Sequence, residues 1–180
     1  IKADGKVILT ADYGKDNKAY SIVNASSDST KANVEGKGIS MIASKNIGEA
    51  GNKLTFNQTD AVNYGMDALA MDSIYIKGLD DAYDTRVCTM IAREGSIDAE
   101  FSGNTYIREI TANKDILINN RGAELTIDYL GSVPNTPVDY YGPNGDIIPE
   151  TAVIKVLDIN ERTRIDSEMI GGVHHWADSV

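Results

Sequence analysis

A short phrase that returns within the chain is the feature that most constrains its fold. The sequence DGKVILTA around Gly5 reappears as EGKGISMIA around Gly36. A second pair, IYIKGL from Ile74 and TYIREI from Thr105, is displaced by the same interval. Self-similarity at a fixed period of this size is typical of chains that stack one supersecondary unit on the next, because a single unit does not bury its own apolar face. We therefore predict an elongated repeat protein.

Most apolar residues lie in short alternating runs, which is the pattern of β-strands, and Gly, Asn and Asp separate the runs. Segment 59–71 is rich in alanine and methionine, but Gly65 at its middle disfavours a helix by about 1 kcal/mol, so we predict irregular coil there. The expected strands are 7–11, 19–25, 39–43, 53–56, 73–77, 87–92, 96–101, 105–111, 115–118, 123–130 and 152–159.

Two architectures fit many short strands with frequent turns. An antiparallel β-sandwich is one of them, but it has no reason to repeat a glycine-lysine-apolar phrase, whereas a parallel coil does. We therefore predict an all-β fold, a right-handed parallel β-helix (β-solenoid) fragment, with the antiparallel β-sandwich as the alternative. The residues expected to point inward are Ile8, Ile39, Met41, Leu54, Ile74, Ile76, Ile91, Ile97, Ile107, Ile116, Ile118, Leu125 and Ile127.

The four prolines define the domain organisation, because all of them lie between positions 134 and 149. Proline removes a ladder donor and is excluded from central strands, so 132–150 is expected to leave the strand stack as a Pro/Gly-rich loop excursion. The predicted parts are β-helix coils at 1–131, the excursion at 132–150, and further β-helix strands or the start of a next segment at 151–180. The chain begins at Ile1 with no initiator methionine, and we expect an internal fragment of a longer protein.

Composition narrows the possible partners. The formal net charge is -10 and the isoelectric point is about 4.6, which disfavours binding to nucleic-acid phosphates or to anionic lipid. No run approaches the roughly 18 apolar residues that a membrane span needs, so no membrane insertion by this fragment is expected. Cys88 is the single cysteine, and we predict that it is a small core residue without chemistry.

The chain offers few candidates for catalysis or metal binding. Asp80 and Asp81 form an adjacent acidic pair, which we interpret as a solvated turn because no histidine or basic pair of a pectin-cleaving site accompanies it. His174 and His175 lack the further ligands that zinc needs at a suitable spacing. We therefore assign no catalytic residue, no cofactor and no metal site, and we predict that the protein is not an enzyme.

The proline-rich excursion is the expected place for partner contacts. Binding residues concentrate in loops that project from rigid scaffolds. Tyr140 and Tyr141 lie in this excursion and are the candidate partner-binding residues. This assignment is a hypothesis based on their position in the sequence.

Three segments carry a resemblance to a known family: VILTAD from Val7, TYIREITANKDILI from Thr105 and GAELTID from Gly122. They resemble the repeats of large bacterial filamentous haemagglutinin-type proteins, especially the leukotoxin-like filamentous adhesins, over roughly 1–131. The resemblance implies a right-handed parallel β-helix in a long exoprotein, which follows two-partner secretion through an outer-membrane partner. Such a protein is secreted and displayed on the cell surface of a Gram-negative-type bacterium.

The function implied by this resemblance is that of a structural stalk segment. It would display binding regions that recognise a receptor or glycan on host or bacterial surfaces. Two alternatives remain open from the sequence. One is a polysaccharide-degrading β-helix enzyme, and the other is a compact β-sandwich binding module.

Overall fold

The computed structural model describes residues 1–11, 18–26, 28, 30–80, 82–122 and 124–132, with the backbone alone for 129–132 and for strands at 154–157, 169–170 and 173–174. Within these residues the chain forms strands and no helix. The predicted all-β fold is therefore confirmed for the described part of the chain.

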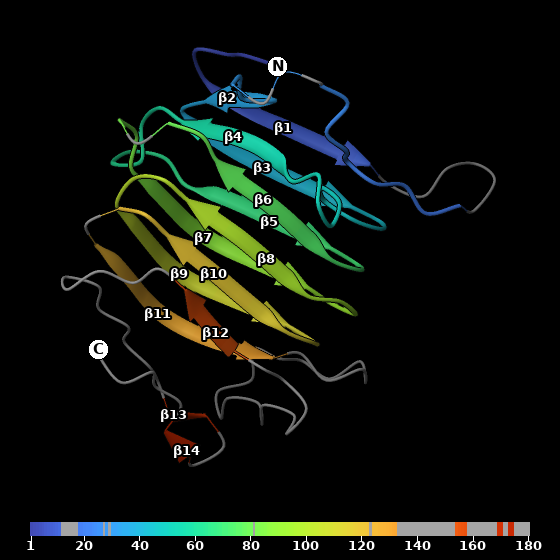
Figure 1. Ribbon diagram of the computed structural model, residues 1–180, viewed down its shortest axis with the longest axis vertical. Helices are drawn as coiled ribbons and strands as arrows, with labels where there is room; N and C mark the ends of the chain where they lie inside the picture. The colour runs from blue at the N-terminus through green and yellow to red at the C-terminus, as the bar shows by residue number, and fades with distance from the viewer. Residues whose placement is uncertain are drawn as a thin grey trace.

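Twelve of the strands form two parallel sheets (Figure 1). The odd-numbered sheet contains β1 (Lys6–Ala11), β3 (Gly38–Ala43), β5 (Met66–Ala70), β7 (Thr85–Ala92), β9 (Thr105–Ala112) and β11 (Leu125–Ser132). The even-numbered sheet contains β2 (Val34–Gly36), β4 (Leu54–Gln58), β6 (Ile74–Gly78), β8 (Ile97–Phe101), β10 (Ile116–Asn120) and β12 (Ile154–Leu157). A separate antiparallel pair joins β13 (Met169–Ile170) and β14 (Val173–His174).

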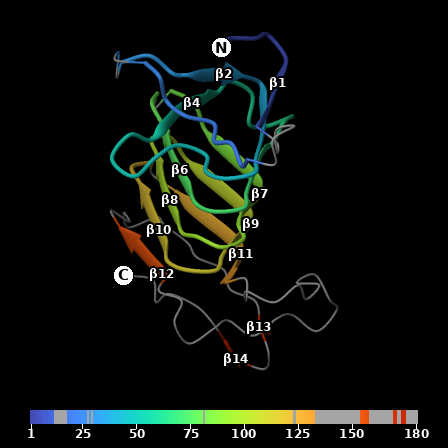
Figure 2. The same ribbon diagram turned by 90° about the vertical axis from the view of Figure 1, so that its right-hand side faces the viewer.

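The chain alternates between the two sheets, so each turn adds one strand to each sheet (Figure 2). Every pairing among β1 to β12 is parallel. This arrangement is a β-solenoid and confirms the predicted parallel β-helix. It also excludes the antiparallel β-sandwich, in which neighbouring strands run in opposite directions.

The core consists of side chains stacked in columns between the sheets. In the odd-numbered sheet one unbroken register column is Val7, Ile39, Met66, Val87, Ile107 and Ile127, and all six side chains are buried. A second column contains Ile74, Ile97 and Ile116 of the even-numbered sheet and Ile47, which bridges to Ile74 from outside the named strands; all four are fully buried. Each turn therefore buries its apolar side chains against those of the next turn, which is how a solenoid accumulates a core.

A column of alanines marks the end of the odd-numbered strands from β1 to β9. It contains Ala11, Ala43, Ala70, Ala92 and Ala112. The last three of these are fully buried and stand immediately before the short corners that lead into the even-numbered sheet. A small side chain here lets the backbone turn across without a steric clash, because protein interiors leave no spare volume.

The repeat length differs from the prediction. In the register, Val7 pairs with Ile39 and Ile39 pairs with Met66, so the first two turns are long and unequal. In the odd-numbered sheet the steps from β7 to β9 and from β9 to β11 are shorter and equal in length, since Val87, Ile107 and Ile127 are evenly spaced register partners. The step from Ile116 of β10 to Ile154 of β12 is long again. The interval from Gly5 to Gly36 is therefore close to the length of the first turn only, and it is not the repeat length of the later turns.

The second phrase pair explains the error. IYIKGL contributes β6 in the even-numbered sheet, whereas TYIREI contributes β9 in the odd-numbered sheet, and these strands do not pair. Both strands alternate inward and outward residues, so the sequence comparison matched strands that are half a turn out of phase. The predicted parallel β-helix is confirmed, although the match between IYIKGL and TYIREI was not valid evidence for it.

Four strands were missed and one was predicted in excess; two of the missed strands are the short pair β13 and β14. β2 is very short, and β5 lies in segment 59–71, where coil was predicted. The alternation of Met66, Ala68 and Ala70 in β5 places three side chains in the core, so tertiary packing overrides the weak strand propensity of alanine. Segment 19–25 is not a named strand and makes a single bridge, between Ile22 and Ile47.

Most of the predicted inward residues are buried, with two exceptions. Ile8 is 65% exposed because Val7 and Leu9 take the inward positions of β1. Ile91 is only partly buried, since Met90 and Ala92 face the core. Cys88 is also partly exposed, so its prediction as a core residue is wrong.

Cys88 points outward because β7 contains an irregularity. The register shifts between Met66 and Asp67, and two consecutive residues of β7, Cys88 and Thr89, both lie outside the core. β9 repeats this pattern at Arg108 and Glu109. A strand that carries one extra outward residue bends locally and re-aims its side chains, as β-bulges do.

Candidate functional site: a groove across three odd-numbered strands

The candidate partner-binding residues from the sequence, Tyr140 and Tyr141, lie outside the described residues, as does the rest of the excursion after Ser132. The structure therefore does not place them. Asp80 accepts a hydrogen bond from the Ala82 amide at 2.9 Å, which fits the predicted turn, and Asp81 lies outside the described residues. Of the histidine pair, only the backbone of His174 is described.

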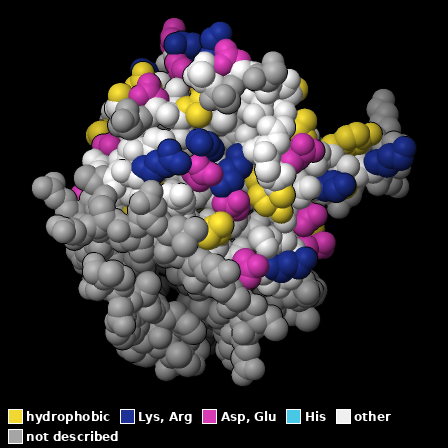
Figure 3. Space-filling model, viewed as in Figure 1, with side chains coloured by type: hydrophobic (Ala, Val, Ile, Leu, Met, Phe, Trp, Pro, Cys, Tyr) yellow, Lys and Arg dark blue, Asp and Glu magenta, His cyan; other side chains and the backbone are white. Residues whose placement is uncertain are grey.

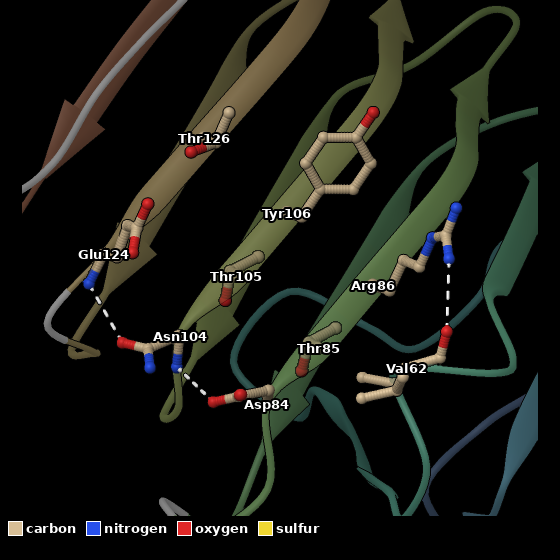
Figure 4. A pocket seen from close by; sticks show the side chains of 10 residues that line it. Val62, Asp84, Thr85, Arg86, Asn104, Thr105, Tyr106, Glu124 and Thr126 are labelled. Atoms are coloured by element: carbon tan, nitrogen blue, oxygen red, sulfur yellow. Dashed lines mark hydrogen bonds between the residues drawn. The ribbon is translucent and has the colours of Figure 1, made fainter.

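A groove of about 460 Å³ opens on the outer face of the odd-numbered sheet. It crosses β7, β9 and β11 near their starts, and the loop between β4 and β5 closes one end (Figure 4). Its lining residues are Ala61, Val62, Asp84, Thr85, Arg86, Asn104, Thr105, Tyr106, Glu124 and Thr126. We call this site the strand groove.

The strand groove is built from three equivalent rows, one for each strand. Arg86, Tyr106 and Thr126 occupy the same outward position in successive strands: Arg86 pairs with Tyr106, and Tyr106 pairs with Thr126. Thr85 and Thr105 pair in the same way one position earlier, and both are buried. Because these turns are equal in length, equivalent positions of the three strands lie in a line along the solenoid axis, and each position carries a different side chain.

A polar ladder runs along one edge of the strand groove, just before the strands begin. The Asn104 amide donates to Oδ1 of Asp84 at 3.2 Å, and the Glu124 amide donates to Oδ1 of Asn104 at 3.1 Å. The dashed lines in Figure 4 mark both bonds. One side-chain oxygen per turn therefore binds the backbone of the next turn, which fixes the spacing of the three rows.

Tyr106 lies at the centre of the strand groove, between Arg86 and Thr126 (Figure 4). The Arg86 guanidinium lies 5.9 Å from the centre of the Tyr106 ring, within the range of a cation–π contact. The Tyr106 hydroxyl donates to a carboxylate oxygen of Asp128. This hydrogen bond, together with partial burial and the negative charge of Asp128, raises the pKa of Tyr106 above its ordinary value.

The loop between β4 and β5 forms an apolar wall at one end. The side-chain amide of the buried Gln58 donates to the Tyr64 carbonyl at 2.9 Å, and its oxygen accepts from the Arg86 amide at 2.9 Å. The Arg86 guanidinium also donates to the Val62 carbonyl at 3.4 Å. These bonds hold the loop against β7 and leave the Val62 side chain 83% exposed beside the groove.

The outer face of the even-numbered sheet carries a network of ion pairs. Lys53 Nζ lies 2.6 Å from Asp98 and 2.7 Å from Glu100, while Lys77 lies 3.2 Å and Arg121 3.9 Å from Glu100. Figure 3 shows basic and acidic side chains gathered near the middle of this face. Partial burial raises the pKa of Glu100, but the hydrogen bonds and charges of Lys53 and Lys77 outweigh it and lower the pKa overall.

Opposite charges neutralise one another in this network, whereas the strand groove keeps exposed polar groups. A second hollow of about 400 Å³ lies over the network and includes Asn24, Asn52 and Lys53. Its lysines already bind carboxylates, so it offers less to a ligand. We therefore treat the strand groove as the candidate functional site.

Sequence reasoning missed the strand groove because it used the wrong period. Asp84, Asn104 and Glu124 are evenly spaced in the chain, and the same interval separates Arg86, Tyr106 and Thr126. A search at this shorter interval would have aligned both sets. Within the described part of the chain, no group of three or more His, Cys, Asp or Glu side chains is placed to hold a metal ion.

Comparisons with known proteins add no family assignment, because no protein family, curated protein or solved structure matches this chain. The resemblance to filamentous haemagglutinin-type adhesins thus remains a prediction from the sequence. The described residues also contain no helix long and apolar enough to cross a membrane.

Proposed function

We propose that this chain is a non-enzymatic structural stalk segment of a long, surface-exposed bacterial filamentous adhesin. The observation that supports the proposal most directly is the continuity of the core columns from β1 to β11. In the backbone ladders each turn pairs only with its neighbours, and the stability of such an array is approximately the sum of turn and interface contributions. A stalk needs this additivity, because further turns then lengthen the solenoid without changing the contacts within or between the existing turns.

The ion-pair network supports the same role. Lys53 stands just before β4 and binds Asp98 and Glu100 of β8, so one side chain spans the intervening strand β6. Lys77 of β6 also binds Glu100. Such cross-turn contacts oppose sliding and bending between turns, in addition to the backbone ladders.

The stalk role further implies secretion, display on the bacterial surface, export of the parent protein through an outer-membrane partner, and a receptor or glycan bound elsewhere on the parent protein. These inferences depend on the resemblance of 1–131 to filamentous adhesins. In this proposal the solenoid contributes reach and stiffness.

Deletion or duplication of one turn tests the proposal. Thr105 and Leu125 are register partners, so removal of 105–124 joins Asn104 to Leu125 without changing which residues face inward. Extra copies of 105–124 should lengthen the chain by roughly 4.8 Å each, measurable by small-angle X-ray scattering on a series with one to six added copies.

The functional readout is adhesion of bacteria that carry the parent protein. A stalk segment tolerates both the deletion and the duplications, so adhesion normalised to the amount of displayed protein should stay the same. A control deletion of 105–114 removes half a turn and should abolish folding. Because 105–124 includes Tyr106 of the strand groove, the deciding variant is a second whole-turn deletion, 7–38, which joins Lys6 to Ile39, the register partner of Val7, and removes no residue of the groove. If this deletion abolishes adhesion while display is normal, the stalk function is wrong for this segment.

A further inference from the structure

We propose that the strand groove binds an uncharged linear oligosaccharide, lying along the solenoid axis across β7, β9 and β11. This inference goes beyond the stalk function and does not depend on it, since it assigns a ligand to the side of the solenoid. The argument rests on the repeat spacing, the lining chemistry and the charge of the strand groove.

The spacing of the rows favours a saccharide over a peptide. Neighbouring strands lie about 4.8 Å apart, so Arg86, Tyr106 and Thr126 present successive side chains at nearly this interval. An extended peptide shows same-face side chains only about every 6.6 Å, which does not match the rows. Linked pyranose rings follow one another at close to the strand spacing, so each ring meets one row, and successive β-1,4-linked rings do so with opposite faces.

The lining combines apolar surface with hydrogen-bonding groups, as a sugar requires. The Tyr106 ring and the exposed Val62 side chain offer apolar surface to the C–H face of a pyranose ring. Asn104, Glu124 and Thr126 supply an amide, a carboxylate and a hydroxyl to the ring hydroxyls. A site with a few fixed polar groups around apolar surface is typical of small-molecule recognition.

The charge of the strand groove favours an uncharged ligand. Asp84 and Glu124 place carboxylates on one edge, and the whole chain carries a formal net charge of -10. Arg86 is the cation of the lining, and it is already engaged by the Tyr106 ring and the Val62 carbonyl. A uronate or sulfated chain would therefore meet electrostatic repulsion.

The strand groove is also preorganised. The bonds from Asn104 to Asp84 and from Glu124 to Asn104 fix the polar edge, and Gln58 fixes the wall. A ligand then loses little free energy to the ordering of the protein, which is the main advantage of a rigid site.

Nuclear magnetic resonance titration of the whole chain tests the proposal. The probes are three neutral hexasaccharides, β-1,4-linked glucose, xylose and N-acetylglucosamine, with hexagalacturonate as the charged comparison. We expect saturable shifts for at least one neutral hexamer, with a dissociation constant at or below about 1 mM. The shifted amides should belong to the rows of the strand groove and to the wall.

Two substitutions locate the site. Tyr106→Ala removes the central ring, and Thr126→Arg fills the third row with a long charged side chain; each should weaken binding at least tenfold. Tyr75→Ala is the matched control, since Tyr75 is a partly buried tyrosine of β6 in the other sheet. It should leave the affinity unchanged, and amide spectra of all three variants establish that each is folded.

Three results would overturn the inference. The first is the absence of saturable binding by all three neutral hexamers to the folded wild-type chain. The second is binding that both folded strand-groove variants retain in full. The third is tighter binding of hexagalacturonate than of every neutral hexamer.

Discussion

The first turns of the solenoid and the later turns use the same core but different lengths of chain. The column steps from Val7 to Ile39 and then to Met66 are long and unequal, whereas the later steps from Val87 to Ile107 and Ile127 are short and equal. The strands differ too, since β7, β9 and β11 are longer than β1, β3 and β5. We call these parts the irregular region, 1–80, and the regular region, 82–132.

The comparison teaches that core columns require only a matching strand register, whereas an outer site requires equal turns as well. Both regions contribute buried side chains to the same columns. The strand groove, however, takes its three rows only from the regular region, where corner residues as well as strand residues recur in register. Extra residues in the irregular region form loops, and one of these supplies the wall beside Val62.

The largest expected difference concerns cavities in the core. Ile39 and Ile107 are both fully buried members of one column, in the irregular and the regular region respectively. We expect Ile107→Ala to lower the free energy of unfolding by about 4–5 kcal/mol and Ile39→Ala by about 2–3 kcal/mol. Long corners allow the irregular region to relax around the cavity, so it recovers part of the lost contact energy.

Urea denaturation of the two variants measures this difference. The same substitution at equal burial makes each variant the control for the other. Equal losses in the free energy of unfolding would show that the irregular region is packed as rigidly as the regular one. The two regions would then differ only in the number of residues per turn.

The second comparison takes one crowded corner glycine of the regular region and one open corner glycine of the irregular region. A Cβ at Gly122 would lie 2.1 Å from the Gly103 carbonyl oxygen, so the backbone of two stacked corners would have to move apart. Gly51 has a φ of 81° but nothing within 4 Å of its Cβ position. Gly122→Ala should cost about 3 kcal/mol, and Gly51→Ala about 1 kcal/mol from backbone strain alone.

Thermal unfolding followed by circular dichroism compares these two variants. We expect the larger drop in melting temperature for Gly122→Ala. A larger drop in melting temperature for Gly51→Ala would mean that the backbone around Gly122 can move to accept a Cβ despite the close contact with Gly103.

The sequence predicted the parallel β-helix but not the number of residues in each of its turns. Alternating runs with Gly and Asn between them were sufficient to identify most strands, because side-chain alternation is a local property of strands. The predicted period failed because odd-numbered and even-numbered strands share the same alternation, so β6 and β9 looked like equivalent units. Which sheet a strand joins depends on the length of each corner, and no local pattern encodes that length.

The strand groove could not be predicted for the same reason. Tyr106 has no special signal in the sequence, and its position beside Arg86 and Asp128 follows from the even register of the regular region. Val62 belongs to a segment predicted as coil, which was correct at that position. Its role as a wall depends on Gln58, whose buried amide connects the loop to β7.

A third difference concerns ion pairs. Lys53 is well buried for a lysine, with 16% of its side chain exposed, and it binds two carboxylates of the regular region. Lys2 binds Glu35 in the irregular region but is 74% exposed. Lys53→Met should lower the free energy of unfolding by about 1–3 kcal/mol, because Asp98 loses its partner and Glu100 loses one of several. Lys2→Met should produce no measurable change, because solvent screens exposed pairs.

Urea denaturation at low and high salt separates the two cases. The loss caused by Lys53→Met should shrink only slightly in about 1 M NaCl, since partly buried pairs are screened less than exposed ones. If the loss of stability caused by Lys53→Met vanishes in high salt, the Lys53 ion pairs are screened by solvent to the same extent as the exposed Lys2 pair.

The smallest expected effect is a pH dependence that Glu100 contributes. Its pKa in the folded chain is lowered from 4.5, so the unfolded chain binds this proton more readily. Glu100 therefore stabilises the fold above about pH 4.5, and this stabilisation is lost as the pH falls through the lowered folded pKa. Glu100→Gln removes the titrating group, so the variant should lose less stability than the wild type between about pH 6 and pH 3.

Glu35→Gln is the matched variant in the irregular region, where the exposed Lys2 lowers the pKa of Glu35. Denaturation midpoints at several pH values measure both slopes. We expect the Glu100 variant to flatten the profile more, because the partly buried Lys53 and Lys77 both act on Glu100, whereas Glu35 is acted on mainly by the exposed Lys2, with smaller effects of Asn57 and the N-terminal amine. Identical slopes for the two variants would mean that the network of the regular region stabilises its carboxylate no more than a single surface pair does.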